Sequence, residues 1–412
     1  MRKFLLTLLS VSAAAAQSPR DWLLPNFAAR LELDALNKSA EHVSTLAVVL
    51  VPEASRTALR FPGSLSIVVN PEDRAILPSQ ADDVDGNGTP DEFAFPVELG
   101  PGETKRFHIY YSTTLRDHLP WPKQVHASHA FGYNRATVAL ESESIGYRTY
   151  GGLFLDIQAR QKDRPGLYNS LVGYFGSGRP TAAGLDIIHL GDTLGLGGFF
   201  LRAGGEIYRP PLNMPDYAHK PPVPEAPEYR VIASGPLRAI VEARMNRWRI
   251  GADEVAVKAV YSIAAGKSHV DCRFEIVPLR LSRVYEAGAG IRHLPSMKLG
   301  SAKGRISLMG TQSPKTGPLG MALYYNPEEA DTAAPLATKE DRNEIIVFRE
   351  KLEPGRAMKG RYSVAGAWSG SGIGDLLGHL AGVEAQARAS IRLENFHVSR
   401  TPRPERLEGE AY

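Results

Sequence analysis

An arginine flanked by tyrosines stands in the run IGYRTY, whose residue types are typical of a β-strand. In a strand, successive side chains point to opposite faces. Arg148 and Tyr150 would then share one face, and Tyr147 would lie on the other. A guanidinium and a phenol on one rigid surface could hold and act on an anionic sugar. Alternatively, Arg148 forms a structural ion pair across a hairpin with Glu141 or Glu143, because such pairs produce similar clusters.

Two histidines are the candidates for a general base. His293 lies in AGAGIRHLP and His189 lies in GLDIIHLGD, both of which are apolar, strand-like runs. An imidazole can accept a proton near neutral pH, although a single histidine in such a run is more often a core residue. None of the chain's histidines forms the i, i+4 pair of a helical zinc site, so a zinc hydrolase is not indicated.

A third candidate site is the acidic loop DVDGNGTPDE. Calcium is bound by oxygen ligands, and a glycine at the sixth position of an EF-hand-like loop allows the sharp turn. An EF-hand would place a glutamate at position 12, where this chain has an alanine. The alternative is an ordinary hairpin turn that binds nothing. The predicted ligands of a structural calcium ion are Asp83, Asp85, Asn87, Asp91 and Glu92.

These candidates must be positioned by β-structure. The 412 residues include 39 glycines and 30 prolines, and the apolar stretches are short and bounded by turn residues, which predicts an all-β protein. We expect a small N-terminal β-sandwich at 22–118 and a large two-sheet β-sandwich at 124–400, separated by a proline-rich segment. One helix is predicted at 375–389, from apolar residues that fall on one stripe.

The N-terminus has the pattern of a secretory signal peptide. Two basic residues and an apolar run that ends in small residues precede Gln17, which predicts a cleaved segment 1–16 and a periplasmic or extracellular location. No later stretch is apolar enough for a membrane span. Cleavage would lower the formal net charge from +3 to +1, which gives no reason to expect a nucleic-acid partner. The single cysteine, Cys272, excludes an intrachain disulfide.

The glycine-rich runs do not indicate a nucleotide enzyme. TLGLGG does not fit G-x-G-x-x-G and follows no βαβ pattern, and GSGIG lacks the Lys-Ser/Thr of a phosphate loop. We therefore expect no cofactor for catalysis.

Five segments, in this order, resemble the exported bacterial family of domain of unknown function 4861: VALESESIGYRTYGG, GLDIIHLGDTLGLGGF, ASGPLRAIVEARMNRW, AGAGIRHLP and SVAGAWSGSG. The acidic loop is also similar to that family. The resemblance implies a role in the degradation of polysaccharides that contain uronic acid, and a large sandwich similar to that of galactose-mutarotase-like proteins. Residues 171–184 contain no histidine where many relatives have one, so the general base stays open.

The reaction that this resemblance implies is elimination from a uronic acid. The substrate carboxylate must be neutralised, a base must remove the C5 proton, and an acid must protonate the leaving oxygen. Arg148 or Arg238 is predicted to neutralise the carboxylate. The predicted catalytic residues are His293 or His189 as the base, Tyr150 or Tyr147 as the acid, and Arg148. The predicted substrate-binding residues are Asn134, Arg135, Glu141, Arg238 and Trp368.

Two alternatives keep the fold. One is a non-catalytic carbohydrate-binding protein, in which aromatic residues such as Trp121 and Trp368 stack on sugars. The other is a glycoside hydrolase that uses Glu141 or Glu143 with Asp186 or Glu286, because that chemistry needs two carboxylates at a defined separation. All three interpretations share an acidic oligosaccharide or polysaccharide as the partner.

Overall fold

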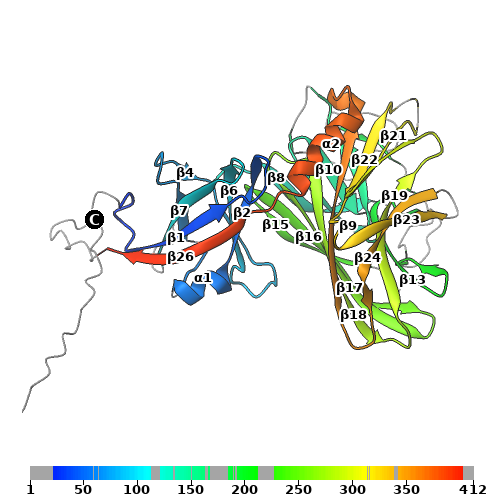
Figure 1. Ribbon diagram of the computed structural model, residues 1–412, viewed down its shortest axis with the longest axis horizontal. Helices are drawn as coiled ribbons and strands as arrows, with labels where there is room; N and C mark the ends of the chain where they lie inside the picture. Colours follow the sequence, from blue (N-terminus) through cyan, green and yellow to red (C-terminus); the bar gives the residue numbers. More distant parts are fainter. Residues whose placement is uncertain are drawn as a thin grey trace, which may run out of the picture.

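The computed structural model describes residues 22–401, except for 59, 64, 113–120, 133–134, 150, 163–165, 168–183, 189, 191–192, 212–226, 313, 315 and 338–341. The predicted signal segment 1–16 lies outside these residues. Four antiparallel sheets form a small and a large β-sandwich (Figure 1). The predicted all-β class is confirmed.

The small sandwich consists of a five-stranded and a three-stranded sheet. The five-stranded sheet has the order β26 (Arg392–Arg400), β1 (Ala29–Leu36), β7 (Thr104–Tyr111), β3 (Ser66–Val69) and β4 (Ile76–Leu77). The three-stranded sheet has the order β2 (Val43–Leu50), β6 (Glu92–Leu99) and β5 (Gln80–Asp82). Between them lies a core of apolar side chains that includes Phe93, Phe95 and Phe107. A short helix that the sequence did not predict, α1 (Val51–Thr57), begins directly after β2 and has Pro52 in its first turn, where proline is tolerated.

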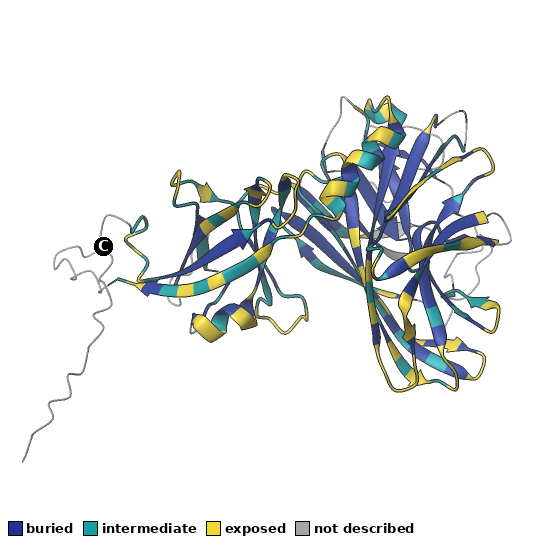
Figure 2. Cartoon of the chain, in the orientation of Figure 1, coloured by how far each residue is buried: buried dark blue, intermediate teal, exposed yellow. Residues whose placement is uncertain are grey.

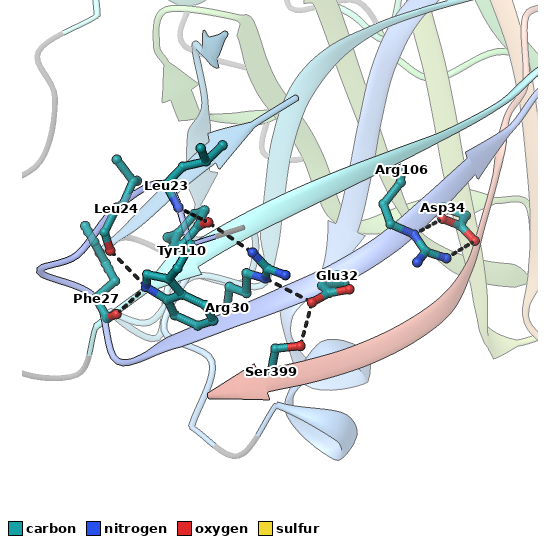
Figure 3. Close-up of polar contacts among 10 residues, drawn as sticks. Leu23, Leu24, Phe27, Arg30, Glu32, Asp34, Arg106, Tyr110 and Ser399 are labelled. Carbon is teal, nitrogen blue, oxygen red and sulfur yellow. Dashed lines mark hydrogen bonds and ion pairs between the residues drawn. The ribbon is translucent and has the colours of Figure 1, made fainter. Parts of the chain in front are cut away.

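The C-terminal strand corrects the predicted boundary of the large sandwich. β26 lies within 124–400, yet it pairs with β1 of the small sandwich (Figure 1). Ser399 Oγ donates to Glu32 Oε1 at 2.5 Å, and Arg106 Nε donates to Asp34 Oδ1 at 2.8 Å on the same sheet (Figure 3). The alternating pattern of β26 predicts a strand but not its partner, because pairing between residues more than 350 positions apart leaves no local signal.

The first sheet of the large sandwich has ten strands. Eight lie in the order β23 (Ala330–Ala337), β24 (Arg342–Leu352), β19 (Tyr285–His293), β13 (Leu196–Ala203), β11 (Leu155–Ala159), β10 (Ile145–Thr149), β9 (Arg135–Ser142) and β8 (Val125–Gly132). Two short strands pair beside this path: β12 (Leu185–Asp186) with β11, and β14 (Glu206–Tyr208) with β13.

The second sheet of the large sandwich has eight strands. Its order is β15 (Glu228–Ser234), β16 (Arg238–Ile250), β17 (Asp253–Ala264), β18 (His269–Arg280), β25 (Met358–Trp368), β22 (Leu319–Tyr324), β21 (Arg305–Gly310) and β20 (Lys298–Ala302). Every second residue of β17 is buried, as expected for a strand with one face in a core (Figure 2).

A single large core joins these two sheets. Phe274 from β18 lies 5.2 Å from Phe199 of β13 and 5.0 Å from Phe348 of β24, between ring centroids. Tyr362 Oη of β25 donates to the carbonyl of Gly197 across the core at 2.5 Å. Such aromatic contacts add to the free energy of burial and fix how the two sheets face each other.

One helix covers the outer face of the eight-stranded sheet. α2 (Leu376–Ala387) packs Leu376, Leu380 and Val383 onto β22 and β25, close to the predicted range 375–389. The Asp375 carboxylate accepts a hydrogen bond from Gly378 N and caps its first turn. Neither helix in the described part of the chain has the length and apolar character of a membrane span.

Candidate functional site

A row of buried polar side chains lies on the outer face of the ten-stranded sheet. Tyr147 and Ile157 belong to the core between the two large sheets, so their neighbours Arg148, Asp156 and Gln158 point the other way. Arg148 lies directly opposite Asp156 in the strand register. These residues, together with Asp186, form what we call the outer-face cluster.

One guanidinium nitrogen lies between two carboxylates in this cluster. Arg148 Nη2 is 3.4 Å from Asp156 Oδ2 and 3.9 Å from Asp186 Oδ2. All three side chains are at most 5% exposed. Buried charges need close partners of opposite charge, and N–O distances of 3.4 and 3.9 Å are long for ion pairs.

A glycine allows Asp186 to reach the cluster. Gly184 has φ of +143°, and a Cβ at this position would lie 2.2 Å from the carbonyl oxygen of Ala159. Only glycine lets β12 approach β11 so closely. Asp186 then lies directly opposite Gln158.

Both aspartates have raised pKa values. Burial raises the pKa of Asp156 well above its usual value, and the neighbouring Asp186 carboxylate raises it further, against the effect of Arg148. Burial also raises the pKa of Asp186, to about 6, although Arg148 and the backbone N–H of Ile188 oppose this. One guanidinium does not fully compensate two buried carboxylates, so both carboxyls keep their protons to a higher pH than a free aspartate does.

The side-chain amide of Gln158 indicates a binding site in this cluster. Gln158 is fully buried, and neither its Nε2 nor its Oε1 has a hydrogen-bond partner among the residues that the structure describes. A buried amide without partners costs free energy, which a bound polar molecule would recover. Beside it, Glu141 and Arg160 form a buried ion pair.

The outer-face cluster therefore combines the groups that acid–base chemistry needs. A protonated carboxyl can donate a proton, and an ionised one can accept a proton. Arg148 and the amide of Gln158 can donate hydrogen bonds to an oxygen that carries negative charge.

Of the predicted bases and acids, His293 and Tyr147 lie elsewhere. His293 Nδ1 is 2.6 Å from Glu344 Oε1, its Nε2 is 3.2 Å from the carbonyl of Met297, and no described contact joins it to Arg148. His293 has the strand parity of Ile291, a core residue, so it lies on the opposite face of the sheet from Arg148. Tyr147 is a core residue whose Oη donates to Ser268 O at 2.5 Å, and burial raises its pKa far above that of a free phenol.

The predicted substrate-binding residues do not form one group. Glu141 is buried with Arg160 beside the cluster. Arg238 lies at the junction of the two sandwiches, where its Nη2 is 2.8 Å from Glu92 Oε2. Trp368 is buried, and its Nε1 donates to Thr316 O at 2.6 Å. The predicted residues Asn134, Tyr150 and His189 lie outside the described residues, as does the side chain of Arg135.

The acidic loop gathers three of its predicted ligands. Carboxylate oxygens of Asp83, Asp85 and Asp91 lie within 4.8 Å of one another, a donor set that suits a hard cation. Asn87 Nδ2 donates to Asp85 Oδ2 at 3.0 Å at the edge of this group. Glu92 is not part of the group, because its carboxylate pairs with Arg238. Hydrogen bonds from the N–H groups of residues 86–88 lower the pKa of Asp83.

Sequence reasoning missed Asp156 and Gln158, and it named Asp186 only for the hydrolase alternative. The available signal was LDIQAR, in which polar residues alternate with apolar ones. Polar residues at every second position of a strand usually face water. Here they are buried, and only the tertiary structure shows this.

Comparison with known proteins places the chain in one family. The model of the family described as Domain of unknown function (DUF4861) matches residues 37–378, a range that includes the outer-face cluster. No curated protein matches the chain.

Two solved structures have a similar arrangement of strands. A glycosyl hydrolase family 38 protein from Enterococcus faecalis has a TM-score of 0.48 and 11% identity, over 92% of this chain and 48% of that one. An alpha-mannosidase from Enterococcus faecalis has a TM-score of 0.46 and 10% identity, over 93% of this chain and 47% of that one. The chain spans about half the length of either protein.

Proposed function

The chain belongs to the family described as Domain of unknown function (DUF4861), and we propose that it is an exported, carbohydrate-active carbon–oxygen lyase that acts on oligosaccharides containing uronic acid. The observation that supports this proposal is the pair of buried aspartates with raised pKa values at Arg148, beside the Gln158 amide, which has no hydrogen-bond partner among the described residues. Export is part of the proposal because of the signal-like N-terminus.

The cluster supplies a group for each part of an elimination. Arg148 and Gln158 donate hydrogen bonds to the uronate carboxylate, which makes the C5 proton more acidic. The ionised member of the aspartate pair removes that proton. The electron pair of the C5–H bond forms the C4=C5 double bond, and the C4–O bond breaks. The protonated aspartate gives its proton to the leaving oxygen, so the pair again holds one proton.

This proposal assigns the acid and the base of the reaction to other residues than the sequence predicted. In this proposal the aspartate pair replaces His293 as the base and Tyr147 as the acid, while the other two candidates, His189 and Tyr150, lie outside the described residues. The reason is distance within the fold: Asp156 and Asp186 lie next to Arg148, whereas His293 is engaged with Glu344 on the other face of the sheet.

The test is incubation of the purified protein with oligosaccharides that end in uronate. Elimination creates a conjugated 4,5-unsaturated uronate, which absorbs ultraviolet light. We expect absorbance to rise with the wild type and with Asp331→Asn, an exposed control, but not with Asp186→Asn. If several polyuronides give no absorbance, or if Asp186→Asn is as active as the wild type, the proposal is wrong.

A glycoside hydrolase is the second candidate, because two carboxylates with different protonation states also suit that reaction. Asp156 and Asp186 would then replace the pairs considered from sequence. New reducing ends without unsaturation would select the hydrolase over the lyase. Binding measured by calorimetry, with an oligosaccharide that stays intact by mass spectrometry, would exclude both.

A further inference from the structure

A groove of about 730 Å³ lies at the junction of the two sandwiches, away from the outer-face cluster. One wall is β2 of the small sandwich, and the other is the outer face of β17, β18 and β25 together with the C-terminal end of α2. In Figure 1, β2 and the C-terminal end of α2 lie next to each other where the two sandwiches meet. We call it the junction groove. Its volume lies within the range of roughly 300–1,000 Å³ that small-molecule sites occupy.

A buried histidine lines the junction groove. His269 is 6% exposed, and its Nδ1 has no hydrogen-bond partner among the described residues. Its Nε2 lies 3.9 Å from Asp271 Oδ1, too far for a hydrogen bond. Burial lowers the pKa of His269, so the ring is neutral at neutral pH and one of its nitrogens can donate a hydrogen bond. An unpartnered donor in a groove wall is suited to a ligand oxygen.

A half-buried lysine lies two residues earlier. Lys267 Nζ donates to the backbone carbonyl of Ser44 on β2 at 2.7 Å, so it connects the two walls of the groove. Burial lowers the pKa of Lys267, which means that the charged amine is insufficiently compensated where it lies. A negative charge in the groove would stabilise it.

Two arginines stand side by side on the same wall. Arg273 of β18 and Arg361 of β25 are directly opposite each other in the register. Like charges in this position repel each other. Arg361 Nη2 pairs with Glu329 Oε1 at 3.0 Å, but Arg273 has no carboxylate partner among the described residues. The strand pairing thus presents a guanidinium to the groove at an electrostatic cost.

We propose that the junction groove binds a small oxyanion-bearing molecule of one or two sugar rings, with Arg273, Lys267 and His269 as donors to its carboxylate, sulfate or phosphate group. The donors come from a single strand and the loop before it, and the small sandwich closes the other side. A ligand in this place contacts both sandwiches and holds them together. The site is separate from the outer-face cluster and needs none of its residues.

The test is isothermal titration calorimetry on the full chain with three probes: digalacturonate, glucose 6-phosphate and neutral galactobiose. We expect at least one anionic probe to bind and galactobiose not to bind. The tighter of the two anions identifies the oxyanion. The proposal is overturned if no anionic probe binds at millimolar concentration, or if galactobiose binds as tightly as digalacturonate.

Variants locate the binding in the groove. Arg273→Ala should weaken binding about tenfold, since a hydrogen bond to a charged group is lost. Arg273→Lys, which keeps the charge, should bind more tightly than Arg273→Ala. Arg280→Ala, an exposed control further along β18, should bind like the wild type. Arg273 lies on the surface, so these variants should fold. Unchanged affinity in Arg273→Ala would contradict the proposal.

Asp186→Asn separates the two sites. This variant should bind the anionic probe in the junction groove with unchanged affinity, even where it has lost activity on uronate-terminated oligosaccharides. If the groove variant Arg273→Ala binds normally and Asp186→Asn does not, the anion occupies the outer-face cluster and the junction groove is not its site.

Discussion

Two arginines in this protein each lie between two carboxylates, and they differ in how closely they are held. At the junction of the sandwiches, Arg238 Nε donates to Asp82 Oδ2 at 2.6 Å, and its Nη2 lies 2.8 Å from Glu92 Oε2. In the outer-face cluster, the nearest carboxylate oxygens lie 3.4 and 3.9 Å from Arg148 Nη2. Both arginines are almost fully buried.

The glutamine side chains near the two arginines also differ, in the hydrogen bonds that they make. Gln80 donates to Asp82 and accepts hydrogen bonds from the backbone N–H groups of Leu237 and Arg238. The junction network is therefore held by short ion pairs and by the hydrogen bonds of Gln80, which is typical of a structural role. In the outer-face cluster, Gln158 has no hydrogen-bond partner among the described residues, and the pKa values of both aspartates are raised. Loose, incompletely satisfied polar groups that are buried are typical of functional sites.

The largest expected effect is on activity. Asp186→Asn removes one member of the aspartate pair, and we expect the rate of elimination to fall about 10²–10⁴-fold, the usual contribution of a general acid or base. Asp82→Asn, the matched change at Arg238, should leave kcat within about threefold of the wild type, because its effect is on the folded structure. Equal losses of kcat in the two variants would remove the distinction between the arginines.

The next effect is on stability. Arg238→Met leaves Asp82 and Glu92 without their cation, and we expect the free energy of unfolding to fall by about 3–5 kcal/mol. Arg244→Met on the same strand breaks only a half-exposed pair with Glu242 and should cost about 0–1 kcal/mol. Urea denaturation measures both. A cost for Arg238→Met no larger than that for Arg244→Met would mean that the junction network is not structural.

A smaller effect concerns pH. The pKa of Asp186 is raised to about 6 in the folded protein, so its contribution to stability is fully present below the unfolded value and is lost as the pH rises through about 6. Relative to Asp186→Asn, which does not ionise, the wild type should lose on the order of 1–3 kcal/mol between pH 4 and pH 7. Urea unfolding at a series of pH values measures this difference. A constant difference, or one that grows in the wild type's favour, would contradict the raised pKa.

The smallest effect concerns the acidic loop next to Asp82. If Asp83, Asp85 and Asp91 hold calcium, millimolar calcium should raise the melting temperature by about 2–4 °C, because a ligand of the folded state stabilises it. Chelation should reverse the shift, and Asp85→Asn should abolish it. A melting temperature that is the same in calcium, magnesium and chelator would identify the loop as a hairpin turn held by its own hydrogen bonds.

The sequence by itself determined the strands and the class of fold. β17 alternates buried and half-buried residues as its apolar pattern predicts, and the predicted helix forms close to its expected range. These features are local, because apolar residues that recur every two or 3.6 positions lie close together in the sequence. Arg148 was also singled out from the sequence, because it stands beside tyrosines in a strand-like run.

The tertiary structure alone decided which distant residues meet. It brought Asp156 and Asp186 to Arg148, kept His293 on the opposite face of the sheet, and carried β26 back to β1. The physical reason is that the pattern of one strand states which side chains share a face, but not which strand lies next to it or whether that face is covered. Burial of the LDIQAR face, which raises the pKa of Asp156, depends on the whole sheet.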